Sequence, residues 1–354
     1  MIPYTTGIGI MSGTSLDGLD LAWCGFSEME KGHWDYKVLD AKTIPYPDEL
    51  RERLARATEL SALEYCRLDV ALGERIADEV NAFIGGNARP DFIASHGHTV
   101  FHQPGKGLTT QIGSGAVIAA RTGIPTVSDF RVVDVALQGQ GAPLVPIGDE
   151  LLFGQYDACL NLGGFSNVSF RQNGRRVAFD ISPCNIALNM LARDAGMAYD
   201  TDGNMAASGH CLPDLLEQLN GLDYYTLPGP KSLGKEWFET NFEPLLAPCR
   251  QKGHIADGLR TAVEHIALQI ARALPESART LLVTGGGALN RFLIQRLSAL
   301  FPGTLTVPDK RIVEFKEALI FAFLGLLRIN HRINTLNTVT GAIKESCGGC
   351  VWHP

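Results

Sequence analysis

Short apolar runs separated by polar, glycine-rich turns open the chain. Residues 8–11 are apolar, residues 12–18 contain Ser, Thr, Asp and two Gly, and residues 19–26 are largely apolar again. The pattern recurs over residues 158–170, around the turn Gly163-Gly164. Short apolar runs bounded by turn residues predict strands. Two such strand-turn-strand units suggest an internal duplication, with one copy in each of two domains.

Apolar residues at helical spacing follow in both halves of the chain. Residues 63–84 carry them at every third or fourth position and end at Gly85-Gly86, and residues 255–274 carry a comparable stripe. This spacing predicts long amphipathic helices. Strands that alternate with helices indicate an α/β protein. Further strands are predicted at 90–94, 125–127, 176–180 and 280–284, and further helices at 116–120, 290–300 and 314–330.

Composition and charge narrow the class of protein. Of the 354 residues, 45% are hydrophobic and 19% charged, which is too apolar for a disordered chain. The formal net charge is −7, without the basic excess typical of a nucleic-acid surface. The apolar stretch 318–327 is too short to span a membrane, and Asp17 and Asp20 interrupt the place of a signal peptide's apolar core. We therefore expect a cytoplasmic protein without nucleic-acid or membrane partners.

The eight cysteines are scattered along the chain, so we expect free thiols rather than a disulfide framework. Cys347 and Cys350 form one CxxC pair near the C-terminus. A zinc site needs more ligands than one pair, and a redox pair usually stands at the start of a helix. We therefore expect no catalytic role for these two residues.

Glycine-rich turns after strands favour phosphate binding, because bare backbone N–H groups can converge on an anion. The chain lacks GxxxxGK[ST], which excludes a P-loop. A nicotinamide oxidoreductase is disfavoured, because Asn290 stands where the run from Gly285 would need its third glycine. The turn at 12–18 combines glycines and hydroxyls with Asp17, which could hold Mg²⁺ through water. On these residues alone, an ordinary polar turn explains the pattern equally well.

Longer motifs, in collinear order along essentially the whole chain, are more specific than any single turn. They lie at 9–20, 95–99, 129–136, 139–146, 161–167, 206–209, 285–290, 316–318 and 340–342, with Tyr199, Asp200 and Gly203 between them. In these segments the chain resembles the anhydro-N-acetylmuramic acid kinase family. The resemblance implies a two-domain, actin-like (ribonuclease H-like) ATPase fold with an interdomain cleft. One domain would contain residues 1–135 and 314–354, and the other residues 136–313.

The resemblance also implies a reaction, its ligands and their contacts. Family members use ATP, Mg²⁺ and water to convert 1,6-anhydro-N-acetylmuramic acid into N-acetylmuramic acid 6-phosphate and ADP, in the recycling of cell-wall sugar, and a homodimer is a family expectation. The implied sugar contacts are His96, Thr99, Arg131, Asp134 and Asn185. The implied nucleotide contacts are Gly13, Thr14, Ser15, Asp17, Gly18, Gly163, Gly164, Gly285, Gly286 and Gly287, with Asp17 also the metal ligand.

The reaction needs a base for the water, and the resemblance assigns this role to Asp180. In segment 180–185 the chain departs from the family pattern, because Ser182 and Cys184 replace two glycines. Side chains there would narrow a turn that lets the backbone approach the sugar. Asp180 could instead cap the helix that begins near Asn185, although Ser182 suits that position better.

Other assignments compete with plain structural explanations. Glu317 matches a family residue that would help position the water, or it is a first-turn glutamate favoured by the helix dipole. Arg131 and Asp134 would contact the sugar, or they form a surface ion pair. The three histidines that begin at His96 suggest a metal, but a zinc site needs a fourth ligand and a defined scaffold. We therefore interpret His96 and Thr99 as sugar contacts.

Besides the disfavoured nicotinamide oxidoreductase, two alternatives to the family's reaction stay open at this point. One is a kinase of the same fold for another 1,6-anhydrosugar, and segment 181–184 would decide this question. The other is a nucleotide-binding regulatory module without turnover. The presence of Asp17, Asp180 and Glu317 argues against the second.

Overall fold

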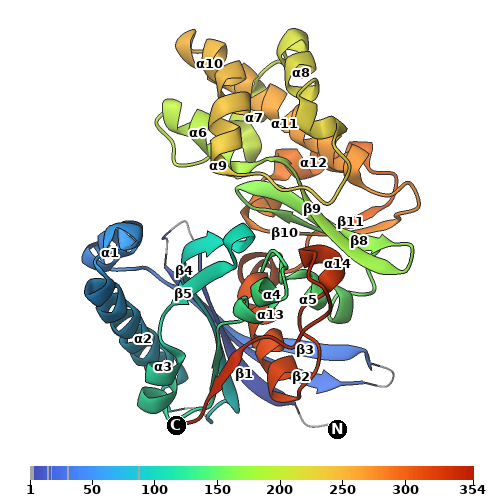
Figure 1. The fold of residues 1–354 in the computed structure, drawn as a ribbon. Helices are drawn as coiled ribbons and strands as arrows, with labels where there is room; N and C mark the ends of the chain where they lie inside the picture. Colours follow the sequence, from blue (N-terminus) through green and yellow to red (C-terminus); the bar gives the residue numbers. More distant parts are fainter. Residues whose placement is uncertain (1–3, 14–15, 17, 30–31, 87) are drawn as a thin grey trace. The chain divides into compact units, whose positions relative to one another are not determined.

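The computed structural model describes the chain except residues 1–3, 14–15, 17, 30–31 and 87 (Figure 1). The chain divides into two compact units. Unit 1 comprises Met1–Phe153 and Phe315–Pro354, and unit 2 comprises Gly154–Glu314. The first division lies farther along the chain than the sequence analysis expected. Helix α5 (Pro146–Leu151) thereby belongs to unit 1, where it packs against α13 (Lys310–Ile329) through Gly148 and Ile320.

Unit 1 is built on one seven-stranded sheet. Its order is β12-β6-β4-β1-β2-β3, with β5 paired to β4. β1, β2 and β3 form an antiparallel meander, whereas β4 and β6 add parallel to β1. The strands are β1 (Thr5–Ser12), β2 (Leu19–Glu28), β3 (Trp34–Ile44), β4 (Phe92–Gln103), β5 (Leu108–Ile112), β6 (Thr126–Ser128) and β12 (Cys350–Trp352).

The two faces of β1 bury different partners. Ile8 and Ile10 belong to one apolar cluster with residues of helices α2 and α3. Gly9 lies against α13, where a Cβ would collide with the carbonyl oxygen of Ala318, so only glycine permits this approach. The helices of unit 1 besides α5 and α13 are α1 (Asp48–Ala55), α2 (Ala62–Ile84), α3 (Gly115–Thr122), α4 (Val132–Ala136) and α14 (Asn337–Thr340).

Unit 2 repeats the strand order of unit 1. Its five-stranded sheet has the order β11-β10-β7-β8-β9. β7, β8 and β9 form the antiparallel meander, and β10 and β11 add parallel to β7. The repeated order supports the internal duplication and confirms the predicted α/β class. The strands are β7 (Ala158–Leu162), β8 (Phe165–Gln172), β9 (Arg175–Pro183), β10 (Thr280–Thr284) and β11 (Thr304–Thr306).

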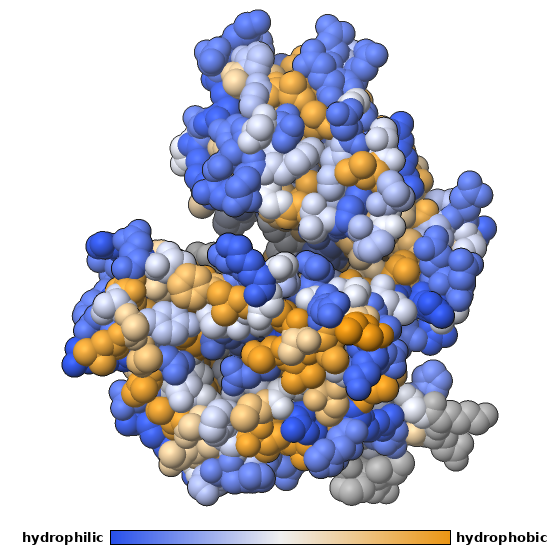
Figure 2. Space-filling view, in the orientation of Figure 1, coloured by the Kyte–Doolittle hydropathy of each residue, from blue (hydrophilic) through white to orange (hydrophobic). Residues whose placement is uncertain are grey.

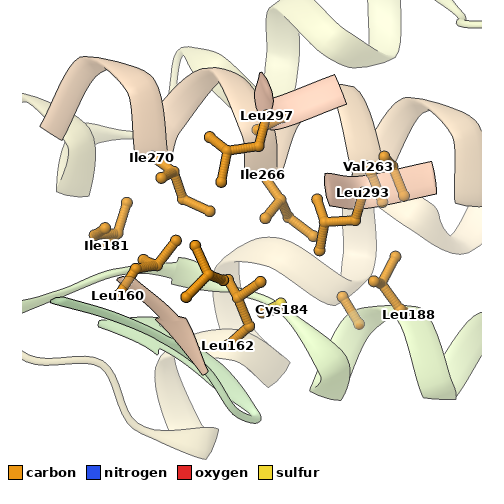
Figure 3. Packing of buried hydrophobic residues seen from close by; sticks show 14 of the residues in the cluster. Leu160, Leu162, Ile181, Cys184, Leu188, Val263, Ile266, Ile270, Leu293 and Leu297 are labelled. Carbon is orange, nitrogen blue, oxygen red and sulfur yellow. The ribbon is translucent and has the colours of Figure 1, made fainter. Parts of the chain in front are cut away.

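The core of unit 2 forms between its sheet and helix α11 (Ile255–Ala273). Ile266 and Ile270 of this helix pack in one cluster with Leu160 of β7 and Leu293 of α12 (Figure 3). Each such side chain contributes about 1.5–3 kcal/mol when it is fully buried. The other helices are α6 (Asn185–Asp194), α7 (Asn204–Ser208), α8 (Pro213–Asn220), α9 (Lys235–Trp237), α10 (Glu243–Gln251) and α12 (Arg291–Leu300), with short turns η4 (Thr201–Gly203), η5 (Asp223–Thr226), η6 (Phe238–Phe242) and η7 (Gly286–Leu289).

The surface of both units is mostly hydrophilic in the view of Figure 2, with apolar patches on unit 1. The exposed apolar side chains of unit 1 include Val132, Val133 and Ile343. None of the helices in the described part of the chain has the length and apolarity needed to cross a bilayer. All eight cysteines are free thiols, as predicted.

Candidate active site

The predicted site residues gather in two sets, one in each unit, where parallel strands end. In α/β sheets this edge is where ligands bind. In unit 1, β1 ends at Ser12, which pairs with His98 of β4, and β6 ends shortly before Arg131. In unit 2, β7 ends before Gly163 and β10 ends before Gly285. Each unit therefore carries its own set of candidate residues.

The N-terminal turn of unit 1 begins on a buried hydrogen-bonded chain. The Tyr46 hydroxyl donates to Ser12 Oγ at 2.6 Å, and Ser12 Oγ lies 3.1 Å from His98 Nδ1. Because the Ser12 hydroxyl accepts from Tyr46, its own proton is available to His98 Nδ1. Burial lowers the pKa of His98, which keeps the ring neutral for this role. Of the predicted phosphate-binding residues, Gly13 and Gly18 flank the turn, while Thr14, Ser15 and Asp17 lie outside the described residues.

His96 is buried and holds the side chain of Arg131. His96 Nδ1 lies 2.8 Å from the carbonyl oxygen of Gly97, so Nδ1 carries the proton and Nε2 accepts. Arg131 Nε donates to this Nε2 at 3.0 Å, and Arg131 Nη1 donates to the Gly141 carbonyl at 2.5 Å. Burial, with the neighbouring Arg131 cation, lowers the pKa of His96 to about 3. His96 is thus a neutral acceptor at physiological pH.

Arg131 and Glu317 influence each other electrostatically. Burial lowers the pKa of Arg131 to about 10, and the Glu317 carboxylate opposes this shift. Glu317 is an exposed residue. Desolvation of its carboxyl by the surrounding protein nevertheless raises the pKa of Glu317, and the Arg131 cation opposes this rise. The neighbouring Lys316 is fixed in the interior by a 2.7 Å ion pair with Asp149 of α5. A held guanidinium next to a solvent-accessible carboxyl can bind an anion or orient a water molecule.

Asp134 and Thr99 have different surroundings from Arg131. Asp134 is 1% exposed. Its Oδ2 accepts from the Gly141 N–H at 2.7 Å, and its Oδ1 accepts from the Thr340 hydroxyl at 2.8 Å. These contacts anchor the 139–141 loop beside Arg131, so Asp134 does not form the surface ion pair considered for it. Thr99 is half-buried and accepts from Gln111 Nε2 at 3.3 Å.

The two glycine turns of unit 2 meet at Asn185. Its Nδ2 donates to the Leu162 carbonyl at 2.9 Å, and its main-chain N–H donates to the Gly163 carbonyl at 3.1 Å. Gly285 has φ +82°, and a Cβ there would collide with Asn161 and the Leu162 carbonyl. A Cβ at Gly287 would crowd Leu162 in the same way. These positions therefore require glycine for packing.

Gly164 and Gly286 differ from the glycines just described because both are exposed. Among the described residues other than its chain neighbours, none has an atom within 4 Å of a Cβ placed at Gly164, and only Asn185 has one within 4 Å of a Cβ placed at Gly286. Gly286 therefore leaves open backbone next to the Asn185 side chain, and Gly164 leaves open space on the side where a Cβ would stand. Open backbone at strand ends is what a nucleotide cradle needs.

Asp180 of β9 is the carboxylate of unit 2 at this edge. Its Oδ2 accepts from the Leu233 N–H at 2.9 Å. Burial raises the pKa of its carboxyl, and the Leu233 hydrogen bond opposes that rise. Its side chain caps no helix, since α6 begins with Cys184 at the N-cap and lacks a side-chain cap. Asp180 can therefore accept a proton at a pH nearer neutrality than an ordinary aspartate.

The side chains of Ser182 and Cys184 lie in the interior of unit 2. Ser182 has no exposed surface, and its Oγ lies 3.0 Å from Ser166 Oγ across the sheet. Cys184 also has no exposed surface and packs in the core near Leu162 and Leu188 (Figure 3). Both side chains point into the core, contrary to the expectation that they narrow a turn where the backbone approaches the sugar. The two side chains lie on the inner side of the segment, where the glycines of the family pattern carry only hydrogen atoms.

Several contributors to this geometry were missed by the sequence analysis. They are Tyr46, Asp149 and Leu233, together with the contacts of His98 and Lys316, two residues that lie in the quoted motifs 95–99 and 316–318. Each comes from a segment distant in sequence from its partner, so no local pattern could identify it. Among the described residues, no cluster of His, Cys, Asp or Glu could hold a metal ion by itself.

Comparison with known proteins bears on the whole chain. The family model for anhydro-N-acetylmuramic acid kinase matches residues 5–354. An anhydro-N-acetylmuramic acid kinase of Hydrogenovibrio crunogenus is 35% identical over 99% of both chains, and one of Vibrio cholerae is 36% identical over 98% of both. Among solved structures, the ADPNP-bound activator of the 2-hydroxyisocaproyl-CoA dehydratase from Clostridium difficile aligns with a TM-score of 0.44 at 11% identity, covering 90% of this chain and 92% of that one. The sequence similarity thus extends over nearly the full length of the chain.

Proposed function

The chain belongs to the anhydro-N-acetylmuramic acid kinase family, as the motifs predicted, and from this premise we propose that it is the ATP-dependent enzyme of that name. In the proposed reaction, water attacks the anomeric carbon of 1,6-anhydro-N-acetylmuramic acid. The bond from C1 to O6 breaks, and O6 takes the γ-phosphoryl group of ATP. The products are N-acetylmuramic acid 6-phosphate and ADP. The observation that carries this proposal is the family match over the whole chain together with a desolvated carboxylate, Asp180, at a strand-end site.

Asp180 is the proposed general base. It takes a proton from the attacking water, which makes the water a better nucleophile as its bond to C1 forms. The raised pKa supports this role, because a base is most effective when its pKa approaches the working pH. The opposing Leu233 hydrogen bond keeps enough of the carboxyl ionised to accept a proton.

Arg131, His96, Thr99, Asn185 and Glu317 are the proposed sugar-side residues. Arg131 donates to two neutral acceptors, so its positive charge is held in place for a negatively charged or polar group of the sugar. Glu317 would orient the attacking water. Asp134 would act on the sugar indirectly, because its carboxylate anchors the 139–141 loop that lies beside Arg131.

The glycine turns are the proposed nucleotide contacts. Gly164 and Gly286 offer open backbone, and Gly163, Gly285 and Gly287 shape the turns that carry it. Gly13, Gly18, Thr14, Ser15 and Asp17 would contact the phosphates. When bound with ATP, Mg²⁺ supplies charge neutralisation at the phosphates. Mg²⁺ usually binds through one or two carboxylates, substrate phosphates and water, so Asp17 as a single ligand fits this chemistry.

Both residue sets must act on one sugar for this reaction to occur. The proposal therefore requires the two units to close around their ligands, as is common when phosphoryl transfer must be shielded from water. A homodimer and a cytoplasmic location accompany the proposal as family-based expectations. Sedimentation at several concentrations tests the first, and localisation of the untagged protein by fractionation tests the second.

Isotope labelling tests the reaction directly. We expect incubation with ATP, Mg²⁺ and 1,6-anhydro-N-acetylmuramic acid in ¹⁸O-water to give a 6-phosphosugar labelled at C1. Label found only in inorganic phosphate would identify a simple ATPase and overturn the proposal. Turnover of 1,6-anhydroglucose, with no turnover of the muramic acid substrate, would favour the alternative kinase for another anhydrosugar.

A further inference from the structure

A segment distant in sequence surrounds Asp180 with three hydrogen bonds. The Tyr224 hydroxyl donates to the main-chain carbonyl of Asp180 at 2.6 Å. The Asp180 N–H donates to the carbonyl of Lys231 at 3.0 Å, and the Leu233 N–H donates to Asp180 Oδ2 at 2.9 Å. Both sides of the Asp180 peptide and one carboxyl oxygen are thus held by residues 224–233. We call this segment the aspartate clamp.

The aspartate clamp is itself cross-braced. Lys231 Nζ donates to the carbonyls of Tyr224 at 2.8 Å and Leu227 at 3.1 Å, and it stands 4.4 Å from the centre of the Tyr224 ring. The Tyr224 ring also packs on Trp237, with 5.3 Å between centroids. These contacts join the two ends of the segment, so its hydrogen-bond donors keep a fixed position relative to β9.

The two oxygens of the Asp180 carboxyl are therefore not equivalent. Oδ2 is occupied by the Leu233 N–H, whereas no other part of the described chain donates a hydrogen bond to Oδ1. The carboxyl group of an unheld aspartate rotates, and its two oxygens then exchange positions. Neither oxygen keeps a fixed direction toward a bound water molecule. Holding Oδ2 and the peptide on both sides leaves Oδ1 in one direction. The same N–H stabilises the ionised form of the carboxyl against its desolvation.

We propose that the aspartate clamp is a positioning element that presents Asp180 Oδ1 to the attacking water, with Tyr224 and Lys231 as its positioning residues. The inference rests on the proposed function, since it concerns the base of that reaction. Tyr224 and Lys231 touch neither sugar nor nucleotide in this proposal. They act through Asp180, so their loss should change the rate and its pH dependence more than ligand binding.

A pair of adjacent tyrosines offers a matched test. Tyr224→Phe removes the hydroxyl that holds the Asp180 carbonyl. Tyr225→Phe removes a hydroxyl from the same turn, but this hydroxyl lies 2.8 Å from His265 Nε2 instead. With Tyr224→Phe, we expect kcat to fall about tenfold while KM for the anhydrosugar changes little. Loosening of the Leu233 contact should raise the pKa of Asp180, so the acidic limb of kcat/KM should move about half a pH unit upwards.

Tyr225→Phe should lower the melting temperature without moving the pH profile, which separates positioning from a structural effect. Lys231→Met keeps the aliphatic part of the side chain and removes the Nζ hydrogen bonds that brace the clamp. It should also move the acidic limb of kcat/KM upwards, and it replaces Tyr224→Phe as the test if that variant does not fold. The inference is overturned if the pH profiles of Tyr224→Phe and Lys231→Met match the profile of wild type. An inactive wild-type enzyme would instead overturn the proposed function. The two failures are therefore distinguishable.

Discussion

The two units share one strand order but use the turn after their first strand differently. In unit 2 this turn is short, and its Gly163 and Gly164 carbonyls accept the N–H groups of residues 184–186 at the start of α6. In unit 1 the corresponding turn spans residues 13–18, and α1 begins only at Asp48, after the proline-containing segment that follows β3. In the described part of the unit 1 turn, the Gly13 carbonyl accepts the Leu16 N–H, whereas the short turn of unit 2 satisfies a helix end. A duplicated strand order can thus be kept while turn length decides whether the turn carbonyls bond within the turn or to a following helix.

The same contrast extends to the charged residues at the strand ends. Unit 1 holds a cation, Arg131, on neutral acceptors, whereas unit 2 holds a carboxylate, Asp180, on a backbone N–H. Desolvation lowers the pKa of the first and raises the pKa of the second. In both cases burial weakens the charged form. The carboxylates of Glu317 and Asp134 oppose this effect for Arg131, and the Leu233 N–H opposes it for Asp180.

The largest expected effect comes from removing the unit 2 base. Asp180→Asn keeps the shape but cannot accept a proton, so we expect kcat to fall about 10³-fold or more, or about 4 kcal/mol in the activation barrier. ADP affinity, measured by calorimetry, should stay within about twofold. Asp200→Asn is the matched control, because within the described part of the chain the Asp200 carboxylate accepts only the N–H groups of Met205 and Ala206 in α7. If Asp180→Asn retains a tenth of wild-type activity, the base lies elsewhere.

The next prediction separates packing glycines from open ones within unit 2. Gly285→Ala forces a side chain onto φ +82° and into Asn161, so we expect a loss of about 3 kcal/mol of stability or more. Gly164→Ala meets open space and should cost less than about 1 kcal/mol. Thermal melting measures both losses, and nucleotide titration shows whether Gly164→Ala affects binding instead. Equal melting temperatures for the two variants would contradict the distinction.

The elements that the sequence predicted well are those with long, regular patterns. The stripes that begin at Leu68 and at Ile255 gave helices close to the observed α2 and α11, and the strand at 280–284 has the bounds of β10. β3 was missed because it is an edge strand, exposed over much of its length and rich in charged residues. α8 to α10 were also missed, in a stretch where prolines and glycines interrupt the apolar pattern.

The candidate site was predictable only as far as local motifs extend. Gly163, Gly285 and Asn185 occur in three separate motifs, and their meeting in unit 2 follows from strand order rather than from spacing. The side-chain direction at Ser182 depends on its partner Ser166 across the sheet, and a bulge between Ser166 and Asn167 alters the simple alternation. For this reason the sequence could not tell which side of the segment the two substituted glycines face.

A pH-dependent loss of stability distinguishes two of the buried histidines, His96 and His265, from exposed ones. His96 in unit 1 and His265 in unit 2 both have a pKa lowered to about 3, mainly by burial. The unfolded chain binds their protons near pH 6.5, whereas the folded chain does not, so stability falls as the pH drops below about 6.5. At pH 5 each histidine should account for about 2 kcal/mol. The effect is absent above the ordinary histidine pKa.

Replacing the unit 2 histidine isolates its share of this loss. His265 lies between the Tyr225 hydroxyl and Asn220 Oδ1, at 2.8 Å from each, and the amide of His265→Gln can serve both without titrating. We expect the melting temperature of this variant to fall less than that of wild type between pH 7.5 and pH 5. Carboxyl groups such as Asp180 titrate in both proteins and cancel from the comparison. Parallel curves would show that His265 is protonated in the folded state.

The smallest expected effect concerns the departure from the family pattern in unit 2. Ser182→Gly restores the family's residue, but the Ser182 side chain is fully buried and contacts Ser166 rather than solvent. We therefore expect KM for the anhydrosugar to stay within about twofold, with a stability loss of about 1 kcal/mol from the missing hydrogen bond and the added backbone freedom. Steady-state kinetics with 1,6-anhydro-N-acetylmuramic acid and 1,6-anhydroglucose provides the measurement. A change in preference between these sugars would mean that the inner side of this segment reaches the substrate, and the assignment of its two faces would have to be reversed.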